Sequence, residues 1–265
     1  MAFDGLRAHV QFFMLTTFRY KQVLTAREYN PREICSVGAF ENRLPRVDGL
    51  SFPLTDEDLV LKSKVPNSAC FGHLGRAGCL SLLHFESLKD AVRGLDLSRI
   101  GIYSSISLGP VDTESIAALS ERGYSTLGST LRRMLPPKQI FKYVGNTSAV
   151  QLGIFLGITG PLYSFQDWNA GLSSALDQAL MDLEFNSVDA AIVVASYALD
   201  DCLQNFYFSN QSKKLCEATA CALLVKGDPS SPGTELGATT LRDEPEHDLY
   251  FGTAEALVRL WSQHV

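Results

Sequence analysis

A strand, a helix and a second strand follow one another between residues 162 and 195, and this succession constrains the fold more than any other part of the sequence. Residues 162–165 read as a short strand after a Gly-Pro turn, and residues 172–185 carry leucine and alanine at helical spacing. Residues 189–195 form an almost entirely apolar run. A helix between two buried strands is typical of a right-handed crossover in a parallel sheet covered on both faces. We therefore predict an α/β fold.

Further elements flank this unit. We expect helices over residues 77–91, 113–121, 124–135 and 146–155, and buried strands over residues 100–106 and 218–225. Gly94 is placed to end the first helix. Residues 1–70 read irregularly, with a short strand or helix at 12–18, while residues 227–245 read as a loop and residues 253–263 as a terminal helix.

Composition excludes several classes of protein. The chain has 265 residues, of which 46% are hydrophobic and 20% charged, and this favours a folded domain over a disordered chain. A net charge of −6 without a basic run gives no electrostatic footprint for nucleic acid or anionic lipid. No apolar stretch approaches the roughly 20 residues of a membrane-spanning helix, and we identify no signal peptide.

The cysteines give the expected compartment. They are scattered and form no C-x-x-C pair, which fits reduced, buried thiols better than disulfides or a metal site. We therefore expect a cytoplasmic protein that binds no metal. The six positions are Cys35, Cys70, Cys79, Cys202, Cys216 and Cys221.

The run from Gly160 to Gly171, Gly-Pro-Leu-Tyr-Ser-Phe-Gln-Asp-Trp-Asn-Ala-Gly, resembles the nucleophile region of β-ketoacyl synthases in the thiolase superfamily. In that family the Gly-Pro turn, here Gly160-Pro161, enters a strand that delivers a cysteine to the N-terminus of a buried helix. The helix macrodipole lowers the pKa of such a thiol. Counted from Gly160, the family's cysteine falls at position 169, where this chain has Asn169. An amide cannot form a thioester, and no cysteine lies between Cys79 and Cys202.

One branch of the family lacks this cysteine: the chain-length factors, or ketosynthase-β subunits, of bacterial type II polyketide synthases. They commonly carry Gln-Ala-Gly at the turn, and Asn169-Ala170-Gly171 is similar in kind. The resemblance implies a thiolase-like fold with a contracted second half. Residues 1–226 would form the ketosynthase-like half, and residues 227–265 a C-terminal remnant packed on the same single domain.

The resemblance also implies a function and partners. The chain would be non-catalytic and would pair with a ketosynthase-α through the strand near the nucleophile, as a heterodimer or a higher assembly. It would hold no cofactor, because an acyl carrier protein carries the acyl groups on its phosphopantetheine arm. Its products would be aromatic octaketides of anthraquinone type, or aryl polyenes.

In the family, bulky residues on a helix before the Gly-Pro turn close the elongation tunnel and so set chain length, since a close-packed wall yields at a high cost. Tyr124, Leu127 and Leu131 have the matching spacing on one helix face. The simpler interpretation of these three residues is a stripe of core side chains. Similarly, Asn169 is well suited to cap the helix that begins there.

Two other functions stay open. The chain could be an active acyltransferase or ketosynthase that uses a distant cysteine, Cys202 or Cys216, with His247 as base. It could also be a purely structural partner that stabilises a ketosynthase without shaping its product. The late histidines, His247 and His264, lack the glycine-flanked setting of the family's catalytic pair.

Overall fold

The computed structural model describes residues 16–25, 37–39, 51–52, 66–67, 69–70, 74–106, 144–166, 171–198, 214–226 and 249–250. Their centre is a six-stranded mixed sheet with the strand order β2-β1-β8-β6-β4-β5. The strands are β1 (Thr16–Thr25), β2 (Val37–Ala39), β4 (Ile100–Ile106), β5 (Leu162–Phe165), β6 (Ala190–Tyr197) and β8 (Ala218–Lys226). A small sheet pairs β3 (Ser51–Phe52), β7 (Lys214–Cys216) and β9 (Leu249–Tyr250) in parallel.

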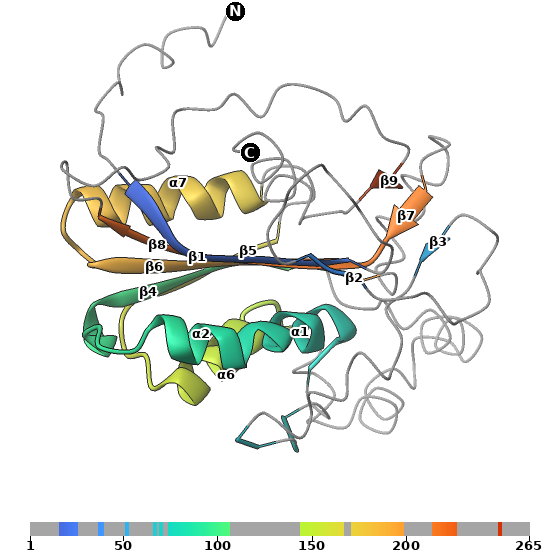
Figure 1. Ribbon diagram of the computed structural model, residues 1–265, viewed down its shortest axis with the longest axis horizontal. Coiled ribbons are helices and arrows are strands. Elements are labelled where there is room, and N and C mark those ends of the chain that lie inside the picture. Colours follow the sequence, from blue (N-terminus) through green and yellow to red (C-terminus); the bar gives the residue numbers. More distant parts are fainter. Residues whose placement is uncertain are drawn as a thin grey trace, which may run out of the picture.

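Helices cover both faces of the large sheet (Figure 1). Helix α7 (Gly171–Glu184) lies on one face. The other face carries α1 (Arg76–Ser81), α2 (Phe85–Ala91) and α6 (Thr147–Leu156), with the 3-10 turn η3 (Leu82–His84) joining α1 to α2. A second 3-10 turn, η4 (Leu97–Arg99), leads into β4. The result is a three-layer α/β/α sandwich.

Alternation along the central strands divides the core between the two faces. Every residue of β4 and β6 is buried. Ile102, Ile192 and Leu223 belong to one apolar cluster with Leu88 of α2 and Leu152 of α6. The residues between them point to the opposite face, toward α7.

The strand–helix–strand unit predicted from sequence is confirmed, with one difference in topology. Strands β5 and β6 both pair in parallel with β4, which lies between them, so α7 joins strands that are two positions apart. The sheet is also not parallel throughout, because β8 runs antiparallel to both β6 and β1. The pairing of β1 with β8 joins segments about two hundred residues apart, and such a pairing leaves no local sequence pattern.

Most other described elements match the expected ranges. The predicted helix 77–91 is broken at η3, and Gly94 follows it with a positive φ of 82°. The short element expected at 12–18 is instead the ten-residue strand β1, which pairs along β8. The predicted helices 113–121, 124–135 and 253–263 and the loop 227–245 lie outside the described residues.

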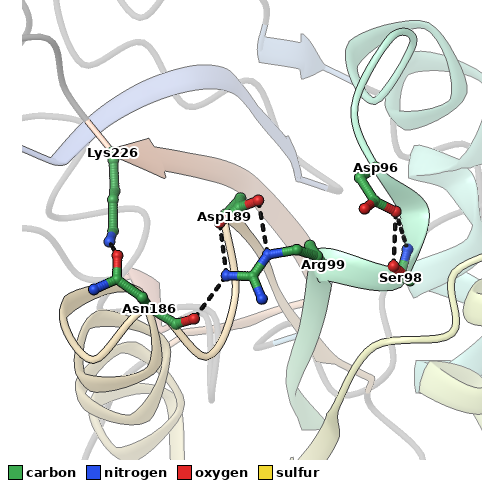
Figure 2. Close-up of polar contacts among 6 residues, drawn as sticks. All are labelled: Asp96, Ser98, Arg99, Asn186, Asp189 and Lys226. Carbon is green, nitrogen blue, oxygen red and sulfur yellow. Dashed lines mark hydrogen bonds and ion pairs between the residues drawn. The ribbon is translucent and has the colours of Figure 1, made fainter.

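A polar clasp made of Arg99, Asn186, Asp189 and Lys226 joins the amino ends of β4 and β6 to the end of β8 (Figure 2). The Arg99 guanidinium donates to both carboxylate oxygens of Asp189 at 2.8 Å and to the Asn186 carbonyl at 2.6 Å. Asn186 has a φ of 58°, and its side-chain oxygen accepts from Lys226. The hydrogen bond from Arg99 holds the pKa of Asp189 below its usual value. The clasp fixes the turn between α7 and β6 at the amino ends of the parallel strands, whereas β5 leads into α7 at their carboxyl ends.

Candidate functional site

The candidate site is the elbow between β5 and α7. Strand β5 ends at Phe165 and α7 begins at Gly171, and both Phe165 and its neighbour Ser105 of β4 lie at the carboxyl edge of the parallel strands. A Cβ placed on Gly171 would lie 2.6 Å from the Ser105 Oγ and 3.6 Å from the Phe165 carbonyl oxygen. The helix therefore starts in close contact with the Ser105 side chain of β4, and glycine at position 171 avoids an overlap with its hydroxyl.

The turn that leads into β5 has the same character. A Cβ on Gly160 would lie 2.1 Å from the carbonyl oxygen of Ile100, so only glycine fits there. Gly157 ends α6 with a left-handed φ of 72°. The Ile102 amide donates to the Pro161 carbonyl at 2.9 Å, and this bond begins the pairing of β4 with β5. The predicted Gly-Pro turn is confirmed.

The predicted site residues divide into two groups. Gly160 and Pro161 directly precede β5, and Gly171 is the first residue of α7. The others fall outside the described residues, so their predicted roles stay predictions; they are Asn169, Ala170, Tyr124, Leu127, Leu131, Cys202 and His247. Of the alternative nucleophiles, Cys216 is the last residue of β7.

A buried polar layer that the sequence analysis missed lies at the same carboxyl edge, on the face covered by α1, α2 and α6. The Nε2 atom of fully buried His84 lies 3.0 Å from the Thr219 Oγ1, which lies 2.7 Å from the Ser196 Oγ. Thr219 also donates to the Ala195 carbonyl at 3.2 Å. Since a hydroxyl has one proton, Ser196 and His84 both donate to Thr219, and His84 carries its proton on Nε2.

Burial sets the charge of this histidine. Desolvation lowers the pKa of His84 to about 3, so the ring is neutral at physiological pH. An ion pair extends the layer: Arg76 donates to Glu217 from Nε at 2.6 Å and from Nη2 at 2.7 Å, and the Glu217 side chain is fully buried. The sequence signal for these residues was a polar side chain among apolar neighbours: His84 within the predicted helix 77–91, Thr219 within β8, and Glu217 just before β8.

On the other face, a buried carboxylate ties α7 to the sheet. The Tyr103 hydroxyl of β4 donates to the Asp182 Oδ2 at 2.7 Å, and Gln178 donates to the Oδ1 at 3.0 Å. The Tyr103 ring stacks on Tyr163 of β5, with ring centroids 5.5 Å apart. Burial and the bond to Asp182 raise the pKa of Tyr103. These contacts fix the rotation of the helix that starts at the elbow.

Among the described strands, β5 lies at one edge of the large sheet. It is the last strand of the large sheet, and its sequence, Leu-Tyr-Ser-Phe, holds no charge and no proline, the residues that commonly guard an edge. Tyr163 is 38% exposed. The exposed large hydrophobic residues of the described part of the chain lie on β5, on the two helices that contact it (α6 and α7), just before α6 or just after α7. We call them the edge patch: Val144, Val150, Ile154, Tyr163, Met181 and Phe185.

Of the described cysteines, Cys70 and Cys221 are buried and Cys79 is partly buried. Cys221 is fully buried in β8, and burial raises the pKa of its thiol. Cys70 is 5% exposed, so it and Cys221 agree with the expected buried thiols, whereas Cys79 does so only in part. Within the described ranges, histidine, cysteine and acidic side chains form no group of three that could hold a metal ion. The helices described here include none with the length and apolarity needed to cross a bilayer.

Comparisons with known proteins identify the fold. No family model matches the chain, and no curated protein does. Among solved structures, the chain is similar to a type II polyketide synthase acyl-carrier protein in complex with its ketosynthase bound to the hexaketide. That likeness has a TM-score of 0.59 at 13% identity over 81% of this chain and 64% of the other.

A β-ketoacyl synthase from Burkholderia phymatum STM815 gives a TM-score of 0.52 at 14% identity, over 67% of this chain and 47% of that one. The chain thus spans less than two-thirds of the length of both structures. At these identities the likeness establishes the fold and not the activity. The chain has the thiolase-like ketosynthase fold predicted from its sequence.

Proposed function

We propose that this chain is the non-catalytic subunit of a ketosynthase pair, a chain-length factor of type II polyketide biosynthesis. One observation carries the proposal: the segment between β5 and α7, residues 166–170, reads Gln-Asp-Trp-Asn-Ala. In a ketosynthase fold this elbow is where the resemblance places the acyl-accepting cysteine, and here Asn169 stands at that position. A carboxamide cannot take an acyl group from a thioester.

A partner then has to supply the thiol. The uncharged edge strand β5 and the edge patch favour this partner's docking, because an unguarded edge strand flanked by apolar side chains is open to pairing with another strand. We propose a ketosynthase-α as the partner, in the cytoplasm, with an acyl carrier protein that delivers the growing chain on its phosphopantetheine arm. The chain itself needs no cofactor in this role.

Within the pair, this chain would shape the far end of the elongation tunnel. Tyr124, Leu127 and Leu131 are the residues proposed to close it. Aromatic octaketides of anthraquinone type and aryl polyenes are the proposed product classes.

Acyl transfer tests the non-catalytic role. The purified full chain is incubated with a malonyl- or acetyl-loaded acyl carrier protein and its intact mass is measured. We expect no covalent adduct, whereas the paired ketosynthase-α under the same conditions gains one acyl group at its cysteine. A stable acyl adduct on Cys202 or Cys216 of this chain would support the acyltransferase alternative and overturn the proposal.

Product length tests the tunnel role. Tyr124→Ala, Leu127→Ala and Leu131→Ala are each assembled with the ketosynthase-α and acyl carrier protein. We expect longer polyketides with an unchanged yield of complex, because a smaller wall residue leaves room for further ketide units. Unaltered product length in all three complexes would favour the purely structural role.

A further inference from the structure

Residues 144–166 contain no acidic, basic or histidine side chain, although 20% of the whole chain is charged. This run comprises α6, the turn at Gly160-Pro161 and the edge strand β5. It therefore gives the β5 end of the sandwich an uncharged surface on the side of α6. A charged partner would find no complementary charge on these residues.

Helix α6 buries one flank against α1 and exposes another. Ser148 is the buried contact: a Cβ on Gly78 of α1 would lie 3.3 Å from the Ser148 Cβ. Val150 is 41% exposed and Ile154 is 66% exposed. With 3.6 residues per turn, they lie about 200° and about 240° around the helix axis from Ser148. Val150 and Ile154 thus form the flank of α6 that is turned away from α1, and we call it the outer flank.

The order of the strands shows where the outer flank points. Helices α1, α2 and α6 cover the same face of the large sheet (Figure 1). Helix α1 contacts β6 and β8, whereas α6 contacts β4 and β5. In the order β8-β6-β4-β5, moving from α1 to α6 therefore leads toward β5, the last described strand. The outer flank faces past this strand, beyond the edge of the sheet.

The backbone of β5 has hydrogen-bonding groups directed the same way. The Pro161 carbonyl accepts from the Ile102 amide of β4. Because successive residues of a strand point their backbone groups to opposite sides, those of Tyr163 also face β4. The N–H and C=O groups of Leu162 and Ser164 face away from β4, and none of the described strands pairs with β5 on that side.

We infer that β5 and the outer flank of α6 together bind one uncharged, extended strand of the partner ketosynthase. This inference rests on the proposed function and names the part of the chain that holds the partner. The added strand pairs with the backbone of Leu162 and Ser164, and every second side chain of it points to the α6 side. An apolar side chain there packs against Val150 and Ile154, whereas a charged one would be desolvated without a counterpart.

Photo-crosslinking tests the contact. The full chain carrying Ile154→p-benzoylphenylalanine is co-expressed with the ketosynthase-α, irradiated and digested, and the crosslinked peptides are sequenced by mass spectrometry. We expect crosslinks to one uncharged strand of the partner. Glu86 is the matched control position, an exposed residue of α2 in the same helical layer, and p-benzoylphenylalanine there should give no crosslink.

Affinity gives a second measurement. Ile154→Asp should weaken the complex by about tenfold or more, because a carboxylate would be buried against an apolar side chain. Ile154→Leu, which keeps an apolar side chain, should bind as the unaltered chain does. Far-UV circular dichroism checks that both variants are folded.

The outcomes separate this inference from the proposed function. If the unaltered chain forms the complex, but Ile154→Asp binds equally well and position 154 gives no crosslink to the partner, the inference is overturned and the proposed function stands. If the unaltered chain forms no complex with the ketosynthase-α, both are overturned. Crosslinks from position 154 to a second copy of this chain would identify a homodimer at this surface and overturn the assignment of the partner.

Discussion

His84 shows how one residue can make the stability of the whole molecule depend on pH. Its ring is fully buried and donates to Thr219, and its pKa is lowered to about 3 from 6.5 because a charged imidazolium would lack water there. Between these two values the unfolded chain binds a proton that the folded chain does not. Stability is therefore unaffected by this group above pH 6.5 and falls as the pH drops toward 3.

Replacing His84 with glutamine should remove this dependence, because an amide can donate to Thr219 without taking up a proton. We expect the free energy of unfolding of the unaltered chain to fall by about 1.4 kcal/mol per pH unit below pH 6.5 relative to H84Q. Urea unfolding at pH 7.0, 6.0 and 5.0 measures the difference. Parallel pH profiles for the two proteins would mean that His84 takes up its proton in the folded state as readily as in water.

Tyr103 and Asp182 give a second prediction at this scale. Tyr103→Phe leaves the buried carboxylate with Gln178 as its described side-chain donor, so we expect a loss of about 1–3 kcal/mol in unfolding free energy. Removing both polar groups, as in Tyr103→Phe with Asp182→Leu, should recover part of that loss, because the buried carboxylate is removed together with the hydroxyl that donates to it. Chemical denaturation of the four proteins in this double-mutant cycle gives the coupling, and additive effects would contradict it.

At the scale of the elements, the start of α7 at the elbow lies close to β4, and a larger side chain at Gly171 tests this contact. Gly171→Ala places a Cβ 2.6 Å from the Ser105 Oγ, so we expect a loss of stability of about 1–3 kcal/mol. With Ser105→Ala in the background, the nearest remaining atoms are the Phe165 carbonyl oxygen at 3.6 Å and the residue 105 Cβ at 3.7 Å, which are ordinary contacts.

In the Ser105→Ala background we expect Gly171→Ala to cost little stability, because the crowding atom is gone and alanine has a higher helix propensity than glycine. Thermal or urea unfolding of the two single variants and the double variant measures this rescue. An equal cost of Gly171→Ala in both backgrounds would place the constraint somewhere other than Ser105.

The elements themselves differ in how well sequence predicts them. Strands β4, β5, β6 and β8 and helices α6 and α7 each have a strong local pattern, and the sequence located each of them within one or two residues. Strand β1 lacks such a pattern, because it is defined by its pairing with β8, about two hundred residues away in the chain. Local residue preferences do not predict a strand pairing between such distant segments.

The candidate site also divides into residues that a local motif identified and residues that only long-range contacts define. Gly160 and Gly171 were identified from a local motif, and their steric reason became visible only with the strands around them. The polar layer was beyond local reasoning, since His84 and Thr219 are 135 residues apart and Arg76 and Glu217 are 141 apart. A buried pair of this kind appears in a sequence only as two isolated polar residues among apolar neighbours.

At the scale of the whole molecule, the proposed function requires an interface, and the β5 edge of the sheet is the interface that we propose. The two faces of the sheet are covered by helices, whereas the β5 edge carries uncharged side chains with the edge patch on either side. A charge introduced on this strand would have to be desolvated when a second strand pairs with it, and lysine on an edge is a common guard against such pairing. Tyr163→Lys is therefore a direct test of the edge as an interface.

We expect Tyr163→Lys to lower the affinity for the ketosynthase-α by at least tenfold, because a buried lysine replaces an aromatic contact at the centre of the seam. Tyr163→Phe, the matched control, keeps the ring that stacks on Tyr103 and should bind as the unaltered chain does. Analytical ultracentrifugation of each chain with the partner measures affinity, and far-UV circular dichroism checks that the fold is kept. Unchanged binding by a folded Tyr163→Lys chain would move the proposed interface away from β5.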